Sequence, residues 1–204
     1  MTGTEAAASL VTQQLDEGIA AWAELARQVA EPTVREQVEA AGRVVVAALQ
    51  SGRTLLVAGN GGSAAIASHV AAEFLGKCIH DRHPLPAISL AESHSSLTAI
   101  GNDYGFDQVF ARQVGALGRP GDVIVGISTS GKSPNILAAL KVARERKLVT
   151  VGFTRSGQTA MNALCDVVVG APSEETALIQ QLHITVGHAI CHLVEREMFG
   201  GTRG

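Results

Sequence analysis

The chain has 204 residues, of which 46% are apolar and 3% aromatic, and its formal net charge is −3. This length and apolar content predict one soluble domain with a substantial core. The small negative charge, without a run of Lys and Arg interleaved with aromatic residues, argues against nucleic acid as a partner. No stretch reaches about 18 uninterrupted apolar residues, and the first residues lack the basic cluster of a signal peptide. We therefore expect a cytoplasmic protein without membrane contact.

The first 52 residues have a helical pattern. Apolar side chains recur at helical spacing between residues 6 and 30, and Pro32 opens a second helix that runs to about Leu49. Because neither helix can bury its apolar face alone, we expect the pair to cover one face of a sheet or to meet another subunit. Residues 1–52 are interpreted as a helical extension and residues 53–204 as the main domain.

From Arg53 onward, short aliphatic runs alternate with helical patterns. Strands are predicted near residues 54–58, 86–90, 122–127, 148–153 and 166–169. Helices are predicted near residues 62–76, 94–117 with a break around Gly101, 133–146, 158–164 and 174–198. This alternation predicts an α/β fold, a doubly wound five-stranded parallel sheet with helices on both faces. The nearly continuous Val, Ile and Leu content of the strands agrees with coverage of both faces.

A loop of small residues, Asn60 to Ser63, follows the first predicted strand. Gly61 and Gly62 allow the backbone to approach a ligand closely, and Ser63 begins a helix whose free N–H groups attract anions. Standing alone, the loop would be better explained as a tight strand-to-helix turn.

Two ionisable residues, His69 and Glu73, lie in the helix that follows this loop. They are four residues apart and therefore share one face. They are also the only ionisable side chains between Arg53 and Lys77. A carboxylate on an apolar helix is costly unless it is paired or used, so Glu73 is a candidate general base. The alternative is a glutamate near a helix end that faces water.

A second small-residue loop, Gly126 to Ser133, follows the third predicted strand and matches the nucleotide-binding pattern GxxxxGK[ST]. No later apolar strand ends in the Asp that would hold Mg²⁺, which argues against an ATPase. The hydroxyls of Ser128, Thr129, Ser130 and Ser133, with the N-terminus of the next helix, favour a phosphate site without metal. A Ser-rich helix cap that binds nothing is the alternative.

Together the two loops predict a clamp for a sugar phosphate. Each follows a strand, and open α/β sheets bind ligands beyond the carboxyl ends of their strands. Backbone N–H groups and hydroxyls at that edge would hold the phosphate.

The last predicted helix carries His183, His188 and His192 among aliphatic residues. Histidine titrates near neutrality and binds zinc, so this helix could supply an acid/base group or a metal ligand. Each histidine could instead be a core or surface residue, which is the preferred interpretation for His192. Gln180 and His188 lie about 12 Å apart along an ideal helix, so spacing alone does not establish a metal site.

Four segments in this order resemble one enzyme family. They are GNGGSAAIASHVAAEFLGK, IGNDYGFDQVFARQV, DVIVGISTSGKSPNI and IQQLHITVGHAICHLVE. They are similar to the sedoheptulose 7-phosphate isomerases, or phosphoheptose isomerases, of the sugar-isomerase (SIS) superfamily. The likeness runs over nearly the whole chain, including the N-terminal helices.

The resemblance implies roles for matching residues. Glu73 and His188 would be the acid/base pair of an aldose–ketose isomerisation through an enediol. Zinc, one ion per subunit, would be bound by His69, Glu73, Gln180 and His188. The resemblance also implies a homotetramer with active sites near subunit boundaries. The sugar phosphate would be bound by Asn60, Gly61, Gly62, Ser63, Glu73, Asn102, Asp103, Ser128, Thr129, Ser130, Ser133 and Gln180.

Three positions depart from the family pattern. Lys77 stands where arginine is usual, Lys132 where asparagine is frequent, and Ala177 where aspartate is common. An altered pocket that accepts a ketose phosphate of another length is therefore one alternative. Some relatives are tetrameric adaptors without activity that bind replication-initiation proteins, and this is the second alternative. The presence of Glu73 and His188 favours an enzyme.

Overall fold

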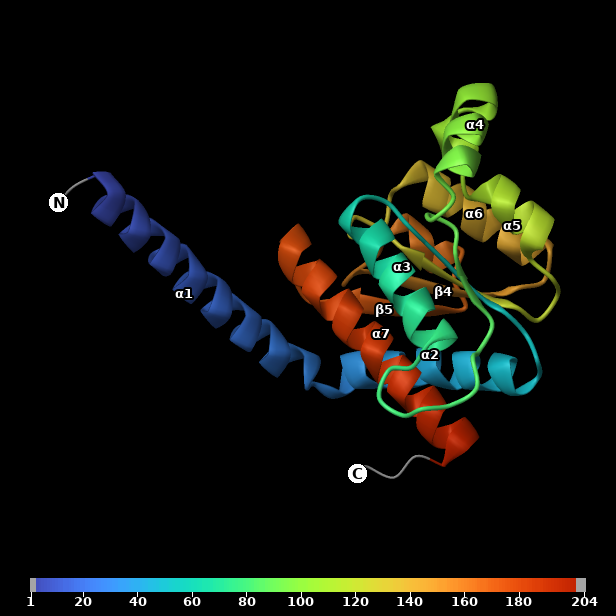
Figure 1. Ribbon diagram of the computed structural model, residues 1–204, viewed down its shortest axis with the longest axis horizontal. Coiled ribbons are helices and arrows are strands. Elements are labelled where there is room, and N and C mark those ends of the chain that lie inside the picture. The colour runs from blue at the N-terminus through green and yellow to red at the C-terminus, as the bar shows by residue number, and fades with distance from the viewer. Residues whose placement is uncertain (1–2, 201–204) are drawn as a thin grey trace.

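A five-stranded parallel sheet forms the centre of the described structure (Figure 1). The computed structural model describes the backbone of residues 3–200 and the side chains of residues 9–200. The strands are β1 (Leu55–Gly59), β2 (Ala87–Ser89), β3 (Val123–Ile127), β4 (Val149–Arg155) and β5 (Val167–Ala171). The helices are α1 (Gly3–Val29), α2 (Pro32–Gln50), α3 (Gly62–Leu75), α4 (His94–Tyr104), α5 (Ala111–Leu117), α6 (Pro134–Glu145) and α7 (Thr176–Phe199), with short 3₁₀ helices η1 (Phe106–Gln108) and η2 (Ala160–Ala163).

The strand order is β2-β1-β3-β4-β5, and every pair of neighbours is parallel. Side chains alternate between the two faces, since successive residues of a strand point to opposite sides. Leu55 and Val57 pack with α2, α3 and α7, whereas Leu56 and Ala58 pack with α5 and α6 on the other face. The predicted doubly wound sheet is therefore confirmed, and its two faces carry separate apolar cores.

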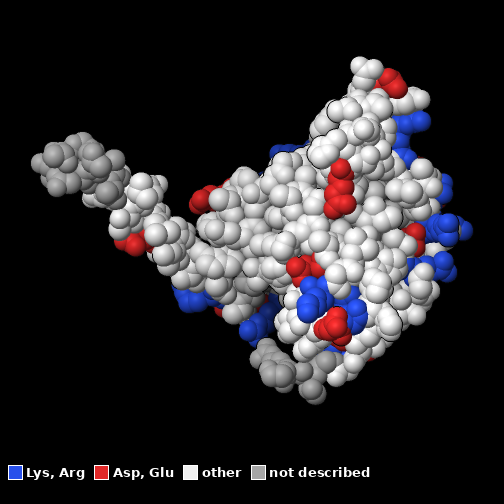
Figure 2. Space-filling model, viewed as in Figure 1, with Lys and Arg blue, Asp and Glu red and all other residues white. Residues whose placement is uncertain are grey.

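The two N-terminal helices behave differently. Helix α2 covers the sheet, and Gln37 accepts a hydrogen bond from the backbone of Gly170 in β5 at 2.9 Å. Helix α1 extends away from the body as an arm (Figure 1). Its apolar side chains Leu10, Val11, Leu15 and Ile19 are 57–70% exposed. Most of the described surface of this arm that faces the viewer in Figure 2 carries no charge.

Two predicted helices differ from the structure. The expected break at Gly101 is wrong, because α4 continues through Gly101, where an added Cβ would meet only Val109 at 3.7 Å. The helix ends instead before Gly105, whose φ of 88° is incompatible with a right-handed helix. The helix predicted at 158–164 is the short 3₁₀ helix η2, held by reciprocal hydrogen bonds between Thr159 and Asn162.

Helix α7 is long and apolar, and its position in the fold explains its composition. Among the described residues it is the one helix that could cross a membrane by length and hydropathy. However, 44% of the residues in its most apolar 18-residue stretch are buried within the protein. Ile179, Leu182 and Val186 belong to the core on the α2 and α3 face of the sheet, so α7 is a core helix.

His183 of α7 is a core residue, which decides between the two interpretations of this histidine. Its imidazole is fully buried, and Nε2 lies 3.1 Å from the Thr154 carbonyl oxygen. Burial lowers the pKa of His183 to about 4, against a partly compensating effect of the Thr154 hydrogen bond. The unfolded chain therefore binds a proton at His183 between about pH 6.5 and 4, whereas the folded chain does not.

Stability should consequently fall as the pH falls through this window. We expect a loss of about 2 kcal/mol between pH 7 and pH 5 from this group, because the unfolded state binds more protons. The measurement is thermal or urea unfolding at both pH values and at one protein concentration, for wild type and His183→Leu. The variant should lose less stability than wild type over this interval. An equal loss in both proteins would show that His183 does not cause the pH dependence.

Candidate active site

The loops after β1 and β3 meet at the point where the chain reverses its direction of winding. Helix α3, after β1, lies on one face of the sheet, and α6, after β3, lies on the other. Open α/β sheets bind ligands at such switch points. Asn60 of the first loop and Asn135 in the first turn of α6, after the second loop, are paired, each side-chain amide donating to the other's oxygen at 2.8 Å. The predicted pair of loops therefore forms one continuous edge.

The hydroxyls of the second loop bond to one another. Ser128 Oγ lies 2.9 Å from Ser133 Oγ and 3.5 Å from Ser130 Oγ, and it accepts the Gly131 N–H at 3.1 Å. Ser133 occupies the N-cap position of α6, yet its side chain makes no capping bond to the described backbone. Ser133 therefore does not cap α6 through its side chain, and its hydroxyl belongs to the Ser cluster.

A pocket of about 240 Å³ opens beside this loop. It is lined by Thr129, Ser130, Lys132, Arg155, Glu174, Thr176 and Ile179. Arg155 pairs with Glu174, and Lys132 is exposed. Hydroxyl donors and cationic side chains thus line the same pocket, and both kinds of group suit an anion.

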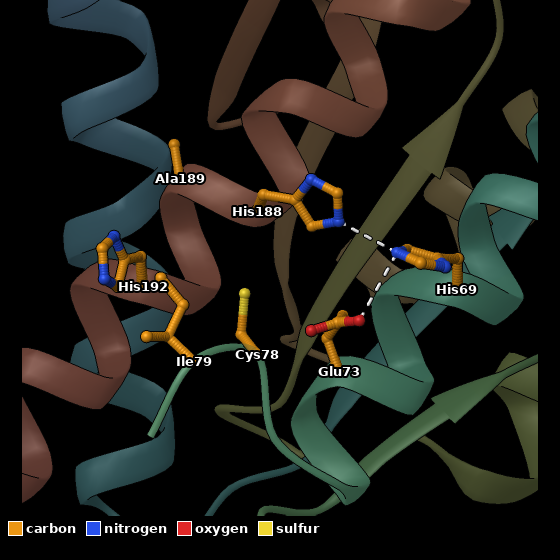
Figure 3. A pocket seen from close by; sticks show the side chains of 7 residues that line it. All are labelled: His69, Glu73, Cys78, Ile79, His188, Ala189 and His192. Atoms are coloured by element: carbon orange, nitrogen blue, oxygen red, sulfur yellow. Dashed lines mark hydrogen bonds and ion pairs between the residues drawn. The ribbon is translucent and has the colours of Figure 1, made fainter.

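A second pocket, of about 460 Å³, lies between α3 and α7. His69 and Glu73 project from α3, and His188 projects toward them from α7 (Figure 3). Nε2 of His69 lies 2.9 Å from Nε2 of His188 and 3.4 Å from Oε1 of Glu73. The imidazole rings meet edge to face. The structure therefore brings the expected acid/base residues from distant parts of the sequence into one pocket.

The same three residues form a candidate metal site. One ligand atom from each lies within 4.8 Å of the others. Zinc prefers histidine nitrogen and carboxylate oxygen at about 2.0–2.1 Å in a tetrahedral arrangement, which places its ligand atoms roughly 3.3 Å apart. The distances of 2.9 and 3.4 Å between the His69, His188 and Glu73 atoms are close to that value. The donor set and its spacing fit a divalent metal.

Other predicted site residues lie elsewhere. The Gln180 amide lies against Gly62 at the start of α3, where a Cβ on Gly62 would come within 2.6 Å of it. Within residues 9–200, no hydrogen bond joins Gln180 to His69, Glu73 or His188. Asn102 and Asp103 bond to each other on the exposed surface of α4 and line neither pocket. The structure of one chain thus brings Gln180 to Gly62 of the first loop, but brings Asn102 and Asp103 to neither pocket.

Sequence reasoning missed several residues near the site. Cys78, Ile79 and Ala189 line the pocket between α3 and α7, as does His192, for which a core or surface role was the preferred interpretation. Burial raises the pKa of the Cys78 thiol to about 12, helped by neighbouring Cys191 and Glu73, so the thiol is neutral. Asn135 is the second residue after the Ser-rich loop, and this position was the available signal for its pairing with Asn60.

Comparison with known proteins shows which family this chain is similar to. A model of the SIS domain matches residues 19–155. The phosphoheptose isomerase of Bradyrhizobium sp. strain BTAi1 is 51% identical over 193 residues, which cover 93% of this chain and 94% of that protein. The phosphoheptose isomerase of Nitratidesulfovibrio vulgaris is 53% identical over 165 residues, covering 78% and 79%.

Solved structures agree with the sequence comparison. A phosphoheptose isomerase from Neisseria gonorrhoeae superimposes with a TM-score of 0.80 and 40% identity over 92% of this chain and 97% of that one. A phosphoheptose isomerase from Francisella tularensis gives a TM-score of 0.82 and 34% identity, covering 93% and 98%. The chain belongs to the phosphoheptose isomerase family within the SIS domain superfamily.

Proposed function

We propose that this protein converts sedoheptulose 7-phosphate into a D-glycero-heptopyranose 7-phosphate in the cytoplasm, for nucleotide-activated heptose biosynthesis. The proposal depends mainly on one observation. Glu73 and His188 are 115 positions apart in the chain, yet they lie in one pocket, where one nitrogen or oxygen atom from each of Glu73, His188 and His69 lies within 4.8 Å of the other two. The relatives named phosphoheptose isomerase, at 46–54% identity, support the same activity.

The residue types suit a proton transfer between neighbouring carbons. A ketose becomes an aldose when a proton leaves C1, an enediol forms, and a proton is returned to C2. Glu73 would take the carbon-bound proton and return it, because a carboxylate is a suitable base. His188 would move the proton between the two oxygens, because an imidazole can donate and accept near neutral pH. Their side chains approach from different helices, so a substrate in this pocket would be contacted from two sides.

The Ser-rich loop would hold the phosphate. Ser128, Thr129, Ser130 and Ser133 lie at the switch point of the sheet, where Asn60, Gly61, Gly62 and Ser63 form the facing loop. Phosphate bound there would anchor the substrate away from the reacting carbons and orient them. The sequence Gly126 to Ser133 also matches a nucleotide-binding loop, but the family match over nearly the whole chain favours an isomerase over an ATPase.

The donor set supports zinc, one ion per subunit. His69, Glu73 and His188 would hold it, with Gln180 as the further ligand that the family resemblance implies. When bound, zinc supplies a Lewis acid that polarises the substrate carbonyl.

A homotetramer would explain two exposed features. The apolar stripe of α1 has no cover in a single chain within the described residues, and α1 and α7 border a groove of about 550 Å³ that contains Trp22 and Leu178. Large apolar surfaces on such an arm are typical of contacts between subunits. Asn102 and Asp103 on the projecting helix α4 would then contact substrate in the site of a neighbouring subunit.

Purified protein should form an aldose phosphate from sedoheptulose 7-phosphate. The measurement follows product by NMR or by a coupled assay, with and without added zinc, and compares hexulose and octulose phosphates. A preference for the seven-carbon sugar is expected. Absence of turnover in both conditions would favour the adaptor alternative. A preference for another chain length would favour an isomerase with an altered pocket.

A further inference from the structure

A buried ion pair contacts the loop that lines part of the acid/base pocket. Nε of Arg82 lies 3.1 Å from Oε1 of Glu195, and their side chains are only 1% and 0% exposed. Arg82 lies in the loop after α3, and Glu195 lies near the end of α7. The pair therefore joins the two helices that carry Glu73 and His188.

Arg82 binds the carboxyl end of α3. Its Nη2 donates to the carbonyl of Glu73 at 2.7 Å, and its Nη1 donates to the carbonyls of Phe74 and Gly76 at 2.9 and 3.2 Å. These carbonyls lie at the helix end, where they lack N–H partners in the next turn and where the helix dipole favours a cation. The guanidinium thus holds the backbone of Glu73 itself.

Glu195 binds the backbone of residues 78–80, a loop that lines part of the pocket. Its oxygens accept the backbone N–H groups of Cys78, Ile79 and His80 at 2.9, 3.1 and 3.2 Å. Cys78 and Ile79 line the same pocket as Glu73 (Figure 3). Glu195 follows His188 by seven residues, two turns of helix, and so lies near the same face of α7.

The charge state of Glu195 agrees with this arrangement. Burial alone would raise its pKa, but the three backbone N–H bonds and the Arg82 guanidinium outweigh burial and lower it. Buried ion pairs are in general no more stabilising than well-packed apolar side chains. The Arg82 guanidinium binds both the end of α3 and Glu195 of α7. We therefore attribute this network to the relative position of the two helices that it fixes, and not to a gain in stability.

We propose that Arg82 and Glu195 are positioning residues, which fix the distance between α3 and α7 so that Glu73, His69 and His188 converge on one proton-transfer and metal-binding site. This inference rests on the proposed function only in its assumption of the reaction that Glu73, His69 and His188 serve. Neither residue lines the pocket. Arg82 and Glu195 therefore act on the site by positioning the backbone of Glu73 and of the pocket-lining residues Cys78 and Ile79.

Arg82→Lys tests the proposal with the charge of the pair preserved. Lysine can pair with Glu195 but lacks the planar fork that also reaches the Glu73 and Phe74 carbonyls. We expect a folded protein whose zinc affinity, measured on the metal-free protein by competition with a chromophoric chelator, falls 10- to 100-fold, as is typical when the residues behind metal ligands are changed. kcat should fall with it, whereas KM should change little, since the phosphate loop is untouched.

Two further variants separate positioning from general stability. Arg82→Met combined with Glu195→Gln removes both buried charges but keeps an oxygen that can accept backbone N–H bonds of residues 78–80, so it should fold yet show the same loss of zinc affinity. Leu140→Ala opens a cavity in the core on the opposite face of the sheet and should lower the Tm without changing zinc affinity. If zinc affinity is unchanged in Arg82→Lys, or falls equally in Leu140→Ala, the proposal is overturned.

Crystal structures of metal-free wild type and Arg82→Lys give a readout that depends on neither zinc nor turnover. We expect Glu73 to move away from His188 in the variant. Unchanged positions of Glu73, His69 and His188 would overturn the proposal even if the protein proved to bind no zinc. Lack of isomerase activity in the wild type would instead contradict the proposed function and leave this structural comparison valid.

Discussion

Replacing Glu73 by glutamine is expected to lower kcat for the isomerisation by about 10³-fold. Glutamine has nearly the same size and keeps a carbonyl oxygen, but it cannot accept the proton that leaves the substrate carbon. The side chain of Glu73 is only 20% exposed and faces His69. Among the described residues that line this pocket, Glu73 is the one carboxylate, so no other lining residue can replace it as the base. The measurement is steady-state kinetics with sedoheptulose 7-phosphate, together with exchange of the substrate C–H proton in D₂O, which should stop.

His69→Asn is the matched control, because His69 belongs to the candidate metal site but not to the acid/base pair. If Glu73 is the base, excess zinc should restore activity to the His69 variant and not to Glu73→Gln. Equal rescue of both would mean that Glu73 acts only as a ligand. Glu197→Gln, at an exposed position of α7, should have wild-type activity and controls for a simple change of charge.

The sheet was predictable from sequence because its signal is local. Runs such as Val123–Ile127 are continuous in aliphatic residues, and the strands fill both faces of a covered sheet. The order of strands and the meeting of the two loops required the structure, since periodicity does not show which strands are neighbours. Family resemblance supplied His188 as the partner of Glu73, which helical spacing alone did not.

The errors have a different cause in each case. The sequence predicts a helix break around Gly101, but the helix ends before Gly105, because sequence does not show which of these glycines has a positive φ. The buried pair Arg82–Glu195 was missed because its members are 113 residues apart and each is of a type that is usually exposed. Interactions of this kind depend on tertiary contacts, and no local pattern marks them.

Gly59→Ala should be among the most destabilising single-methyl additions in this protein. Gly59 ends β1 directly before the Asn60–Ser63 loop, and a Cβ built there would lie 2.3 Å from the carbonyl oxygen of Ser63 and 2.5 Å from its carbonyl carbon. Both atoms are backbone in the first turn of α3, so they cannot rotate away as a flexible side chain could. Relief of the overlap requires a shift of α3 relative to the sheet. We expect a loss of about 3 kcal/mol in the free energy of unfolding.

The same shift should reach the chemistry, because α3 carries His69 and Glu73 and its preceding loop carries Asn60, the partner of Asn135. Gly59→Ala should therefore lose kcat/KM as well as Tm, measured by steady-state kinetics and thermal unfolding at one protein concentration. Gly115→Ala is the control: this glycine lies within α5, its added Cβ would meet only Val142 at 4.0 Å, and alanine favours a helix by about 0.5–1 kcal/mol. The control should be at least as stable as wild type and fully active. A Gly59→Ala protein with wild-type Tm and kinetics would mean that the junction between β1 and α3 can move without cost, and that the position of the acid/base helix is not set by this contact.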